Sequence, residues 1–277
     1  MDLDLLRSAV GPRWPDAGFF FHPEIGSTND EAARLAREHA PEATVVFADR
    51  QSAGRGRRGA RWHAAPGDDL LLSIVLRPRL PRRRWSRITL ACGLAIRRAV
   101  LECSGLESSI KWPNDVLIDG RKIAGILMEA HGMRDAAAGD TGFAIVGVGL
   151  NVNSAPGDLP VEIRESTASL RTAGGGSPLA RESVAASFLL AFLDLYAACA
   201  DDDRFALLLQ EIRRHSSLLG REVLVSIAGR EFTGLARDLD SDGQLIVDTS
   251  DGGTIALSSV DRIRPIGPGA SHDRQST

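Results

Sequence analysis

The sequence predicts an α+β protein in which a sheet with helices is followed by a small β-barrel. Apolar runs typical of buried strands alternate with segments of helical periodicity over most of the chain. After Ser217, short β runs follow one another with turn signals between them. We therefore expect a first domain over residues 1–216, a second over residues 217–266 and a disordered polar tail over residues 267–277.

Each element is predicted from a local pattern. Strands are expected at the buried apolar runs, over 18–26, 44–51, 69–78 and 142–153. Helices are expected within 1–18 and over 27–40, 88–102, 181–200 and 203–216. Turn signals predict a hairpin at Asp119-Gly120 and, in the second domain, turns at Ala228-Gly229, Asp242-Gly243 and Gly252-Gly253. Thr28 and Glu31 fit a capping box at the start of the second helix.

Composition argues against several classes of protein. The 277 residues carry a formal net charge of -3, whereas a dedicated nucleic-acid binder is normally basic. The three cysteines form no CxxC or Cys/His cluster, which gives no support to a disulfide framework or a zinc site. The N-terminus has no signal-peptide pattern and no run approaches a membrane span. We therefore expect a cytoplasmic protein with no membrane partner.

The segment "DRQSAGRGRRGARWHAAPG", residues 49–67, combines five arginines with four glycines. Glycine lets a backbone approach a ligand closely, and the guanidinium groups of Arg55 and Arg57 suit carboxylate or phosphate oxygens. The segment has no Walker A pattern and its GxGxxG does not open a helix, so it indicates an anion site of another kind. The alternative is a solvated surface loop.

Two neighbouring segments bring charged residues to the predicted hairpin. In "KWPNDVL", residues 111–117, Asp115 could hold Mg²⁺ or orient a base; the alternative, which this segment taken alone favours, is an Asn-Asp turn with a cap. Lys122 follows the hairpin turn and should lie near Asp115 on the partner strand, where it could balance phosphate charge; the alternative is an ordinary edge-strand lysine.

Polar residues also stand at the ends of apolar elements. Asn151 and Asn153 follow a very apolar strand, and strand ends supply ligand crevices in α/β proteins. The sequence "STN" at 27–29 opens a helix, where free N–H groups can bind a polar ligand group. A simple turn and a helix cap are the respective alternatives.

Taken together, these segments resemble the biotin protein ligases. The motifs "GSTN", "QSAGRGRRGARW", "KWPNDV", "KIAGIL" and "GVGLNVN" occur in this order, and the resemblance covers residues 20–266. The fold it implies is a mixed β-sheet with helices, as in class II synthetases and biotin ligases, followed by an SH3-like barrel. One departure is that the 26 residues before Ser27 are too few for the DNA-binding winged helix of some members, so we expect no DNA partner.

The resemblance implies a reaction in two steps. Biotin and ATP give biotinyl-adenylate and pyrophosphate, and a lysine of a biotin carboxyl carrier protein then takes the biotinyl group. Joining an anion to a polyanion requires positive charge at the reacting phosphate, from arginine, lysine and Mg²⁺. No protein nucleophile is required, in agreement with the absence of a GxSxG motif.

The resemblance also implies a role for each motif residue. Biotin contacts are implied for Ser27, Thr28, Asn29, Gln51, Arg55, Gly56, Arg57 and Lys122. Contacts to ATP or the adenylate are implied for Arg57, Trp62, Lys111, Asn114 and Asn151. Catalytic roles are implied for Arg57, Lys122 and Asp115, and Asp115 is also the implied Mg²⁺ ligand.

Two other functions compete with this one. A lipoate or octanoate protein ligase resembles the same class, but its Gly-Gly-Gly turn near the carboxylate-binding strand has no counterpart, since Gly174–Gly176 fall in the late connection. A non-enzymatic nucleic-acid binder could use the arginines of residues 77–87, a loop that carries six of them. Such a protein would bind without ATP and lose affinity steeply with salt. A homodimer through a sheet edge is a further expectation.

Overall fold

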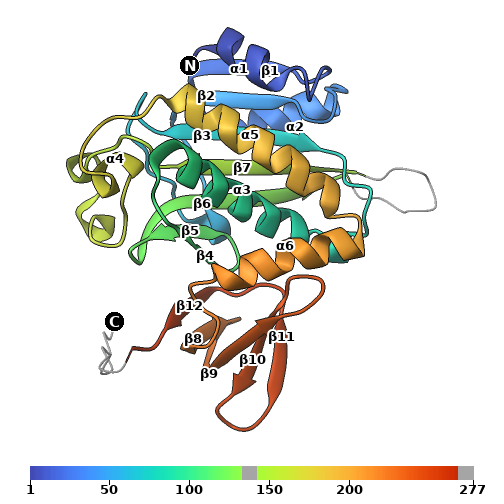
Figure 1. The fold of residues 1–277 in the computed structure, drawn as a ribbon, viewed down its shortest axis with the longest axis vertical. Helices are drawn as coiled ribbons and strands as arrows, with labels where there is room; N and C mark the ends of the chain where they lie inside the picture. The colour runs from blue at the N-terminus through green and yellow to red at the C-terminus, as the bar shows by residue number, and fades with distance from the viewer. Residues whose placement is uncertain (133–141, 268–277) are drawn as a thin grey trace.

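The computed structural model describes residues 1–132 and 142–267, which form two β-sheets with helices (Figure 1). The larger sheet has seven strands in the order β1-β2-β3-β7-β6-β5-β4. Only β1 and β2 are parallel, so the sheet is mixed, as predicted. Its strands are β1 (Phe19–Ile25), β2 (Val45–Gln51), β3 (Leu70–Leu76), β4 (Ser109–Lys111), β5 (Asp115–Ile118), β6 (Arg121–His131) and β7 (Phe143–Leu150).

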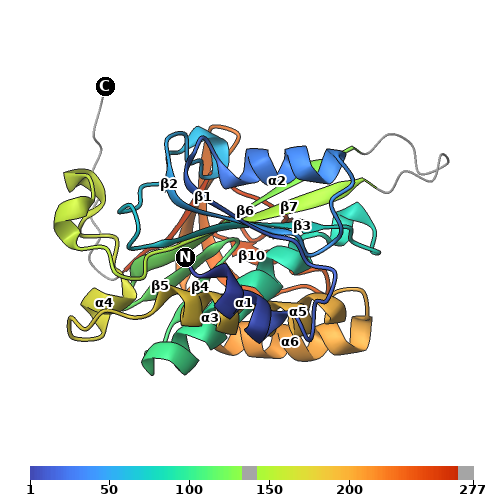
Figure 2. The same ribbon diagram turned by 90° about the horizontal axis from the view of Figure 1, so that it is seen from above.

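The helices cover the two faces of this sheet unequally (Figure 2). α2 (Thr28–Arg37) lies alone on one face, and its apolar side packs on β2, β3 and β7 through small residues such as Ala32 and Ala36. The opposite side carries α1 (Leu3–Val10), α3 (Ser86–Ser104), α5 (Arg181–Ala198) and α6 (Asp202–Arg214). A further short helix, α4 (Leu170–Ala173), lies in the predicted connection. The face under α2 is therefore only partly covered, and the site described below opens on it.

The C-terminal sheet contains β8 (Glu222–Ile227), β9 (Arg230–Leu239), β10 (Leu245–Thr249), β11 (Thr254–Leu257) and β12 (Arg262–Pro265). Its strands are antiparallel in the order β11-β10-β9-β8-β12. The three predicted turns join β8 to β9, β9 to β10 and β10 to β11, which confirms the β-rich module. Within the described residues no ladder joins β11 to β12, so the expected barrel is an open sheet here.

Several local predictions can be compared with the structure. Asp119 and Gly120 have φ of 50° and 75° and join β5 to β6, which confirms the hairpin. The capping box is wrong: Ser27 is the N-cap, and the Thr28 hydroxyl bonds to Gln51 instead. The short strand β4 was not predicted. Apart from Gly267, the expected tail lies outside the described residues. No helix in residues 1–132 or 142–267 is long and apolar enough to cross a membrane.

The arginine-rich segment 77–87 joins parts of the fold. Arg87 is buried in α3, where its guanidinium donates to Asp202 at 2.8 Å and to Asp242 at 2.9 Å. Asp242 belongs to the turn between β9 and β10, so this arginine connects the helices to the C-terminal sheet. Arg77 donates to the carbonyls that end α2 and its following turn. These two arginines therefore serve the fold, which weakens the nucleic-acid interpretation.

Candidate functional site

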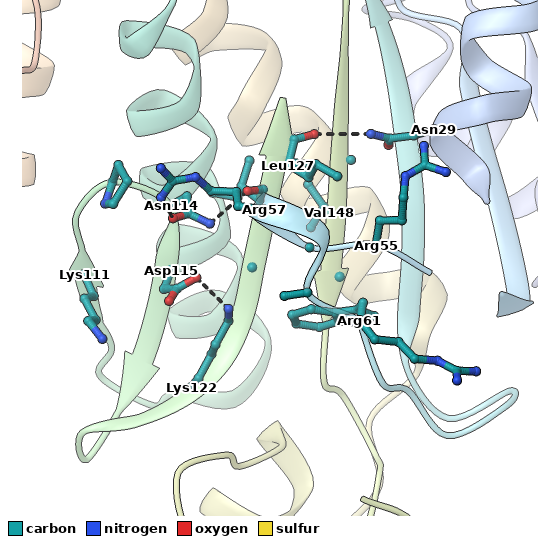
Figure 3. A pocket seen from close by; sticks show the side chains of 18 of the residues that line it. Asn29, Arg55, Arg57, Arg61, Lys111, Asn114, Asp115, Lys122, Leu127 and Val148 are labelled. Atoms are coloured by element: carbon teal, nitrogen blue, oxygen red, sulfur yellow. Dashed lines mark hydrogen bonds and ion pairs between the residues drawn. The ribbon is translucent and has the colours of Figure 1, made fainter. Parts of the chain in front are cut away.

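A cavity of about 260 Å³ opens on the α2 face of the large sheet (Figure 3). The start of α2, the arginine-rich loop after β2 and strands β5, β6 and β7 surround it, and the segment before and within β12 adds one wall. Of the predicted site residues, these line it: Ser27, Thr28, Asn29, Gln51, Arg55, Gly56, Arg57, Trp62, Lys111, Asn114, Asp115 and Lys122. The sequence motifs therefore converge on one place.

A hydrogen-bonded polar network forms one end of the cavity. The Thr28 backbone N–H and hydroxyl both donate to Gln51 Oε1, at 2.8 and 3.1 Å. Ser73, on β3 behind them, lies 2.7 Å from the Thr28 hydroxyl and 2.6 Å from Asn29 Oδ1. Ser27, Thr28 and Asn29 are all buried, so a ligand there meets fixed polar groups in place of water.

A carboxylate fixes the orientation of the Asn29 amide. Asn29 Nδ2 donates to Glu129 Oε2 at 2.5 Å, and its oxygen accepts from Ser73. An ionised carboxylate only accepts hydrogen bonds, so the amide nitrogen must face Glu129. Arg55, expected near a ligand carboxylate, forms a two-fold pair with Asp30 at 2.7 Å, and this pair lowers the pKa of Asp30. Arg55 therefore lines the cavity with its charge already paired to Asp30.

Three glycines make room for the cavity side chains. A methyl group on Gly149 would lie 2.3 Å from the Trp62 indole, and one on Gly125 would lie 2.8 Å from it. Gly125 and Gly149 are directly opposite on β6 and β7, so the indole lies on a bare patch of backbone. A methyl group on Gly147 would lie 2.2 Å from Asn29 Oδ1. The Trp62 indole N–H has no partner among the described residues, so it can donate to a ligand.

Two lysines form a positively charged wall of the cavity, which we call the cationic wall. The chain contains only two lysines, Lys111 and Lys122, and both line this cavity. Lys122 Nζ lies 2.7 Å from Asp115 Oδ1 and 5.3 Å from the centre of the Trp62 ring. Burial lowers the pKa of Lys111, with Asp115 acting in the opposite direction. Two ammonium groups and one carboxylate leave the wall with net positive charge, suited to phosphate oxygens.

Arg57 joins the loop to the C-terminal sheet. Its guanidinium donates to Asn114 Oδ1 at 3.0 Å and to the Val260 carbonyl at 3.1 Å. Burial lowers the pKa of Arg57, and Arg58 adds to the effect. The neighbouring Arg58 pairs with Asp261. Consecutive arginines of the loop therefore hold the segment that precedes β12 against the cavity.

Asn151 lies in a second cavity of about 360 Å³ that shares Trp62, Lys111, Asp115 and Lys122 with the first. Its amide nitrogen donates to the Ala168 carbonyl at 3.0 Å, and its buried oxygen has no partner among the described residues. An unpaired buried oxygen is available to a ligand amino group. Asn153 does not line this cavity, and its side-chain amide forms two hydrogen bonds with the backbone of Leu179.

The residues that line the cavity could bind a metal ion only together with the phosphates of a nucleotide. Within residues 1–132 and 142–267 no three His, Cys, Asp or Glu side chains gather as a metal cage. Asp115 offers one carboxylate beside the two lysines of the same cavity. Mg²⁺ commonly binds through one or two carboxylates together with substrate phosphates, so this arrangement fits an ion that enters with ATP.

Some residues of the site were not predicted. Ser73 and Glu129 sit inside strand patterns, where a single polar residue carries no motif. The segment 260–263 comes from the predicted second domain, and its position depends on how the two sheets pack. The three glycines were visible as "AGIL" and "GVG", and their alternation along β6 and β7 is a signal for close approach of side chains.

Comparison with known proteins gives consistent results. Residues 23–151 match the model of the "Biotin/lipoate A/B protein ligase family", and residues 218–266 match "Biotin protein ligase C terminal domain". A biotin--[acetyl-CoA-carboxylase] ligase of Mycobacterium tuberculosis is 34% identical, covering 86% of this chain and 85% of the relative. The bifunctional ligase/repressor BirA of Bacillus subtilis is 33% identical, covering 84% of this chain and 70% of the relative.

Solved structures agree with these relatives. A biotin protein ligase from Aquifex aeolicus in complex with biotin and ATP has a TM-score of 0.76 and 26% identity, covering 90% of this chain and 99% of that one. The matches define the class of protein as a ligase enzyme with a C-terminal β module. The chain belongs to the biotin/lipoate A/B protein ligase family, and within it to the biotin protein ligases.

Proposed function

We propose that this protein activates biotin with ATP and then transfers it to a lysine of a biotin carboxyl carrier protein. In the first step a biotin carboxylate oxygen bonds to the α-phosphorus, and the bond to the bridging oxygen breaks, releasing pyrophosphate. In the second step the lysine amine bonds to the acyl carbon, AMP leaves and the amine loses a proton. The names of the relatives, which mention biotin, ATP and acetyl-CoA carboxylase, support these substrates.

The observation that carries the proposal is the position of a fixed polar network and a cationic wall in one cavity. The network of Thr28, Asn29 and Gln51 matches a cyclic urea, which has two N–H donors and one carbonyl. Neither the dithiolane ring of lipoate nor the alkyl chain of octanoate has such groups. Both would leave the further hydrogen-bonding capacity of this buried network unused, so biotin is favoured over these acids.

Each chemical task has a candidate residue. Lys122 and Arg57 stabilise charge at the α-phosphate, because both are positively charged and line the first cavity. Lys111 and Asn114 bind the phosphates, and Asn151 binds the adenine or ribose in the adjoining cavity. Trp62 covers the adenylate and limits access of water. Ser27, Gly56 and Arg55 complete the biotin end.

Asp115 has two candidate roles. Its carboxylate orients the incoming amine, and it is the acidic side chain available to a Mg²⁺ ion carried by the nucleotide. Bound Mg²⁺ would neutralise phosphate charge. We also propose that the chain divides into two domains after residue 216, which the separate β8–β12 sheet supports. A homodimer formed through a sheet edge is a further proposal.

Pyrophosphate release tests the proposed activity. The protein would be incubated with ATP and Mg²⁺ and, in separate reactions, with biotin, lipoate or octanoate. We expect release with biotin alone. Release with lipoate or octanoate would keep the chemistry and contradict the assignment of the polar network, and no release with any acid would contradict the ligase activity itself.

A further inference from the structure

A third cavity, of about 380 Å³, lies beside the first, and the two share Arg57 and Asn114 in their walls. It runs between the turn Arg82–Arg84, the start of α3, the loop at Trp112–Pro113, strand β6 and the segment before β12. We call it the basic groove. Its lining residues include Arg82, Arg83, Trp85, Leu90, Pro113, Ile126, Met128, Ala130, Ser258 and Ser259.

The groove has an apolar floor and a charged rim. Trp85, Leu90 and Met128 form part of the floor, and Arg82 and Arg83 stand exposed at the rim. Neither rim guanidinium group has a hydrogen bond or an ion pair with any other described residue, whereas the side chain of the adjacent Arg84 pairs with Asp202 and Asp242. Two positive charges are therefore left facing solvent on a chain whose net charge is negative.

The position of the groove limits what can occupy it. In the proposed function the first cavity holds biotin and the reacting phosphate, and the second holds the rest of the nucleotide. The acceptor amine must still reach the first cavity, and it belongs to a folded protein that needs a surface to rest on. The basic groove meets the first cavity at Arg57 and Asn114, so a protein seated there would be next to the adenylate.

We propose that the basic groove docks the acceptor protein, with acidic side chains near the target lysine facing Arg82 and Arg83. This inference rests on the proposed function and names the surface that its second step uses. An apolar centre with a charged rim is the usual anatomy of a protein interface. Complementary rim charges chiefly raise the rate of association and its salt dependence.

Direct binding tests this inference without turnover. The probe is a fluorescently labelled biotin carboxyl carrier domain of an acetyl-CoA carboxylase with carboxylates near its target lysine. Its Kd would be measured by anisotropy for the wild type, Arg82→Glu, Arg83→Glu and the control Arg79→Glu. Arg79 is exposed in the same segment but does not line the groove. Arg79→Glu therefore makes the same change of charge outside the groove.

We expect each groove variant to weaken binding about fivefold to tenfold at low salt, with the difference shrinking at high salt. Pyrophosphate release with biotin should stay at the wild-type rate in all three variants, since none alters the first cavity. A carrier whose nearby carboxylates are changed to amides should bind wild type and groove variants alike.

Three results would overturn the inference: an unchanged Kd in both groove variants, an equal loss in Arg79→Glu, or no carrier binding by a wild type that releases pyrophosphate with biotin. Loss of duplex DNA binding in the groove variants, with carrier binding intact, would instead assign the arginines to nucleic acid. Failure of wild-type pyrophosphate release is a separate result, because it concerns the proposed function and not the groove.

Discussion

Lys122 Nζ and Asp115 Oδ1 lie 2.7 Å apart on the neighbouring strands β6 and β5. A register shift between Val116 and Leu117 accompanies this pair. The side chains are 34% and 20% exposed, so their pairing contributes at most about 1 kcal/mol to stability. The chain uses arginine at nearly all its basic positions yet keeps lysine here, which indicates that a compact ammonium group is required.

Replacing Lys122 with alanine should therefore impair chemistry much more than folding. Removing the ammonium group that we propose acts on the α-phosphate should slow biotin-dependent ATP–pyrophosphate exchange by about 100-fold or more. The melting temperature should fall by no more than about 2–4 °C. Lys122→Arg keeps the charge and should recover part of the rate. Wild-type exchange in Lys122→Ala would remove this lysine from the mechanism.

Arg57→Gly should let the adenylate escape from the cavity. The substitution removes the hydrogen bonds to Asn114 and Val260 that close the loop against the C-terminal sheet. Released adenylate should biotinylate lysines of a bystander protein such as serum albumin, detected by streptavidin blotting. The enzyme itself should label weakly, because its only two lysines line the cavity. Arg50→Gly, which removes an exposed arginine paired with Glu24, is the control. Unchanged selectivity in Arg57→Gly would contradict the retention role.

Glu129 should control biotin affinity through Asn29. Without the carboxylate the Asn29 amide can rotate and donate to Ser73, and the network then presents the wrong donors to the cyclic urea. Glu129→Ala should raise the KM for biotin about threefold to tenfold, which corresponds to the loss of one neutral hydrogen bond between Asn29 and the ligand. The kcat and the KM for ATP should change little. Glu129→Gln can still accept from Asn29 and should stay close to wild type. Glu38→Ala is the control, because Glu38 is exposed at the C-cap of α2. Equal KM values in all variants would contradict this role.

The sequence predicted the larger part of this site because local patterns specify its backbone. The hairpin at Asp119-Gly120 follows from residues that tolerate positive φ, and it brings the side chain of Lys122 close to that of Asp115, as expected. The ion pair between Arg55 and Asp30 was not predicted, because Asp30 lies on α2 and their contact depends on the packing of the loop against that helix. The contribution of Val260 was missed for the same reason, since it arises where the two sheets meet.

The pH dependence of ATP binding should report on Lys111. Burial lowers the pKa of this lysine below its ordinary value of 10.5, so it loses its charge earlier as the pH rises. Between the lowered pKa and 10.5 the unfolded chain binds more protons, so the contribution of Lys111 to folding stability rises with pH. Phosphate binding needs the charged form, so the KM for ATP should rise over the same window. Lys111→Arg stays protonated there and should abolish the rise. A KM rise that persists in Lys111→Arg would assign the titration to another group.

The glycines beneath the Trp62 indole lead to a prediction about the space that this side chain needs. A methyl group on Gly149 would lie 2.3 Å from the indole, too close for any carbon contact, so Gly149→Ala should force Trp62 out of the cavity. Because Lys122 Nζ lies 5.3 Å from the centre of the Trp62 ring, the shift should disturb both this lysine and the cover that we propose the indole provides for the adenylate. We expect a loss of pyrophosphate exchange of at least about tenfold together with a change in tryptophan fluorescence. Gly157→Ala is the matched control, since its methyl group meets nothing within 4 Å. The double variant Gly149→Ala/Trp62→Ala removes the clash, so it should be no less active than Trp62→Ala alone. A further loss of activity in the double variant would mean that Gly149 has a role other than making room for the Trp62 indole.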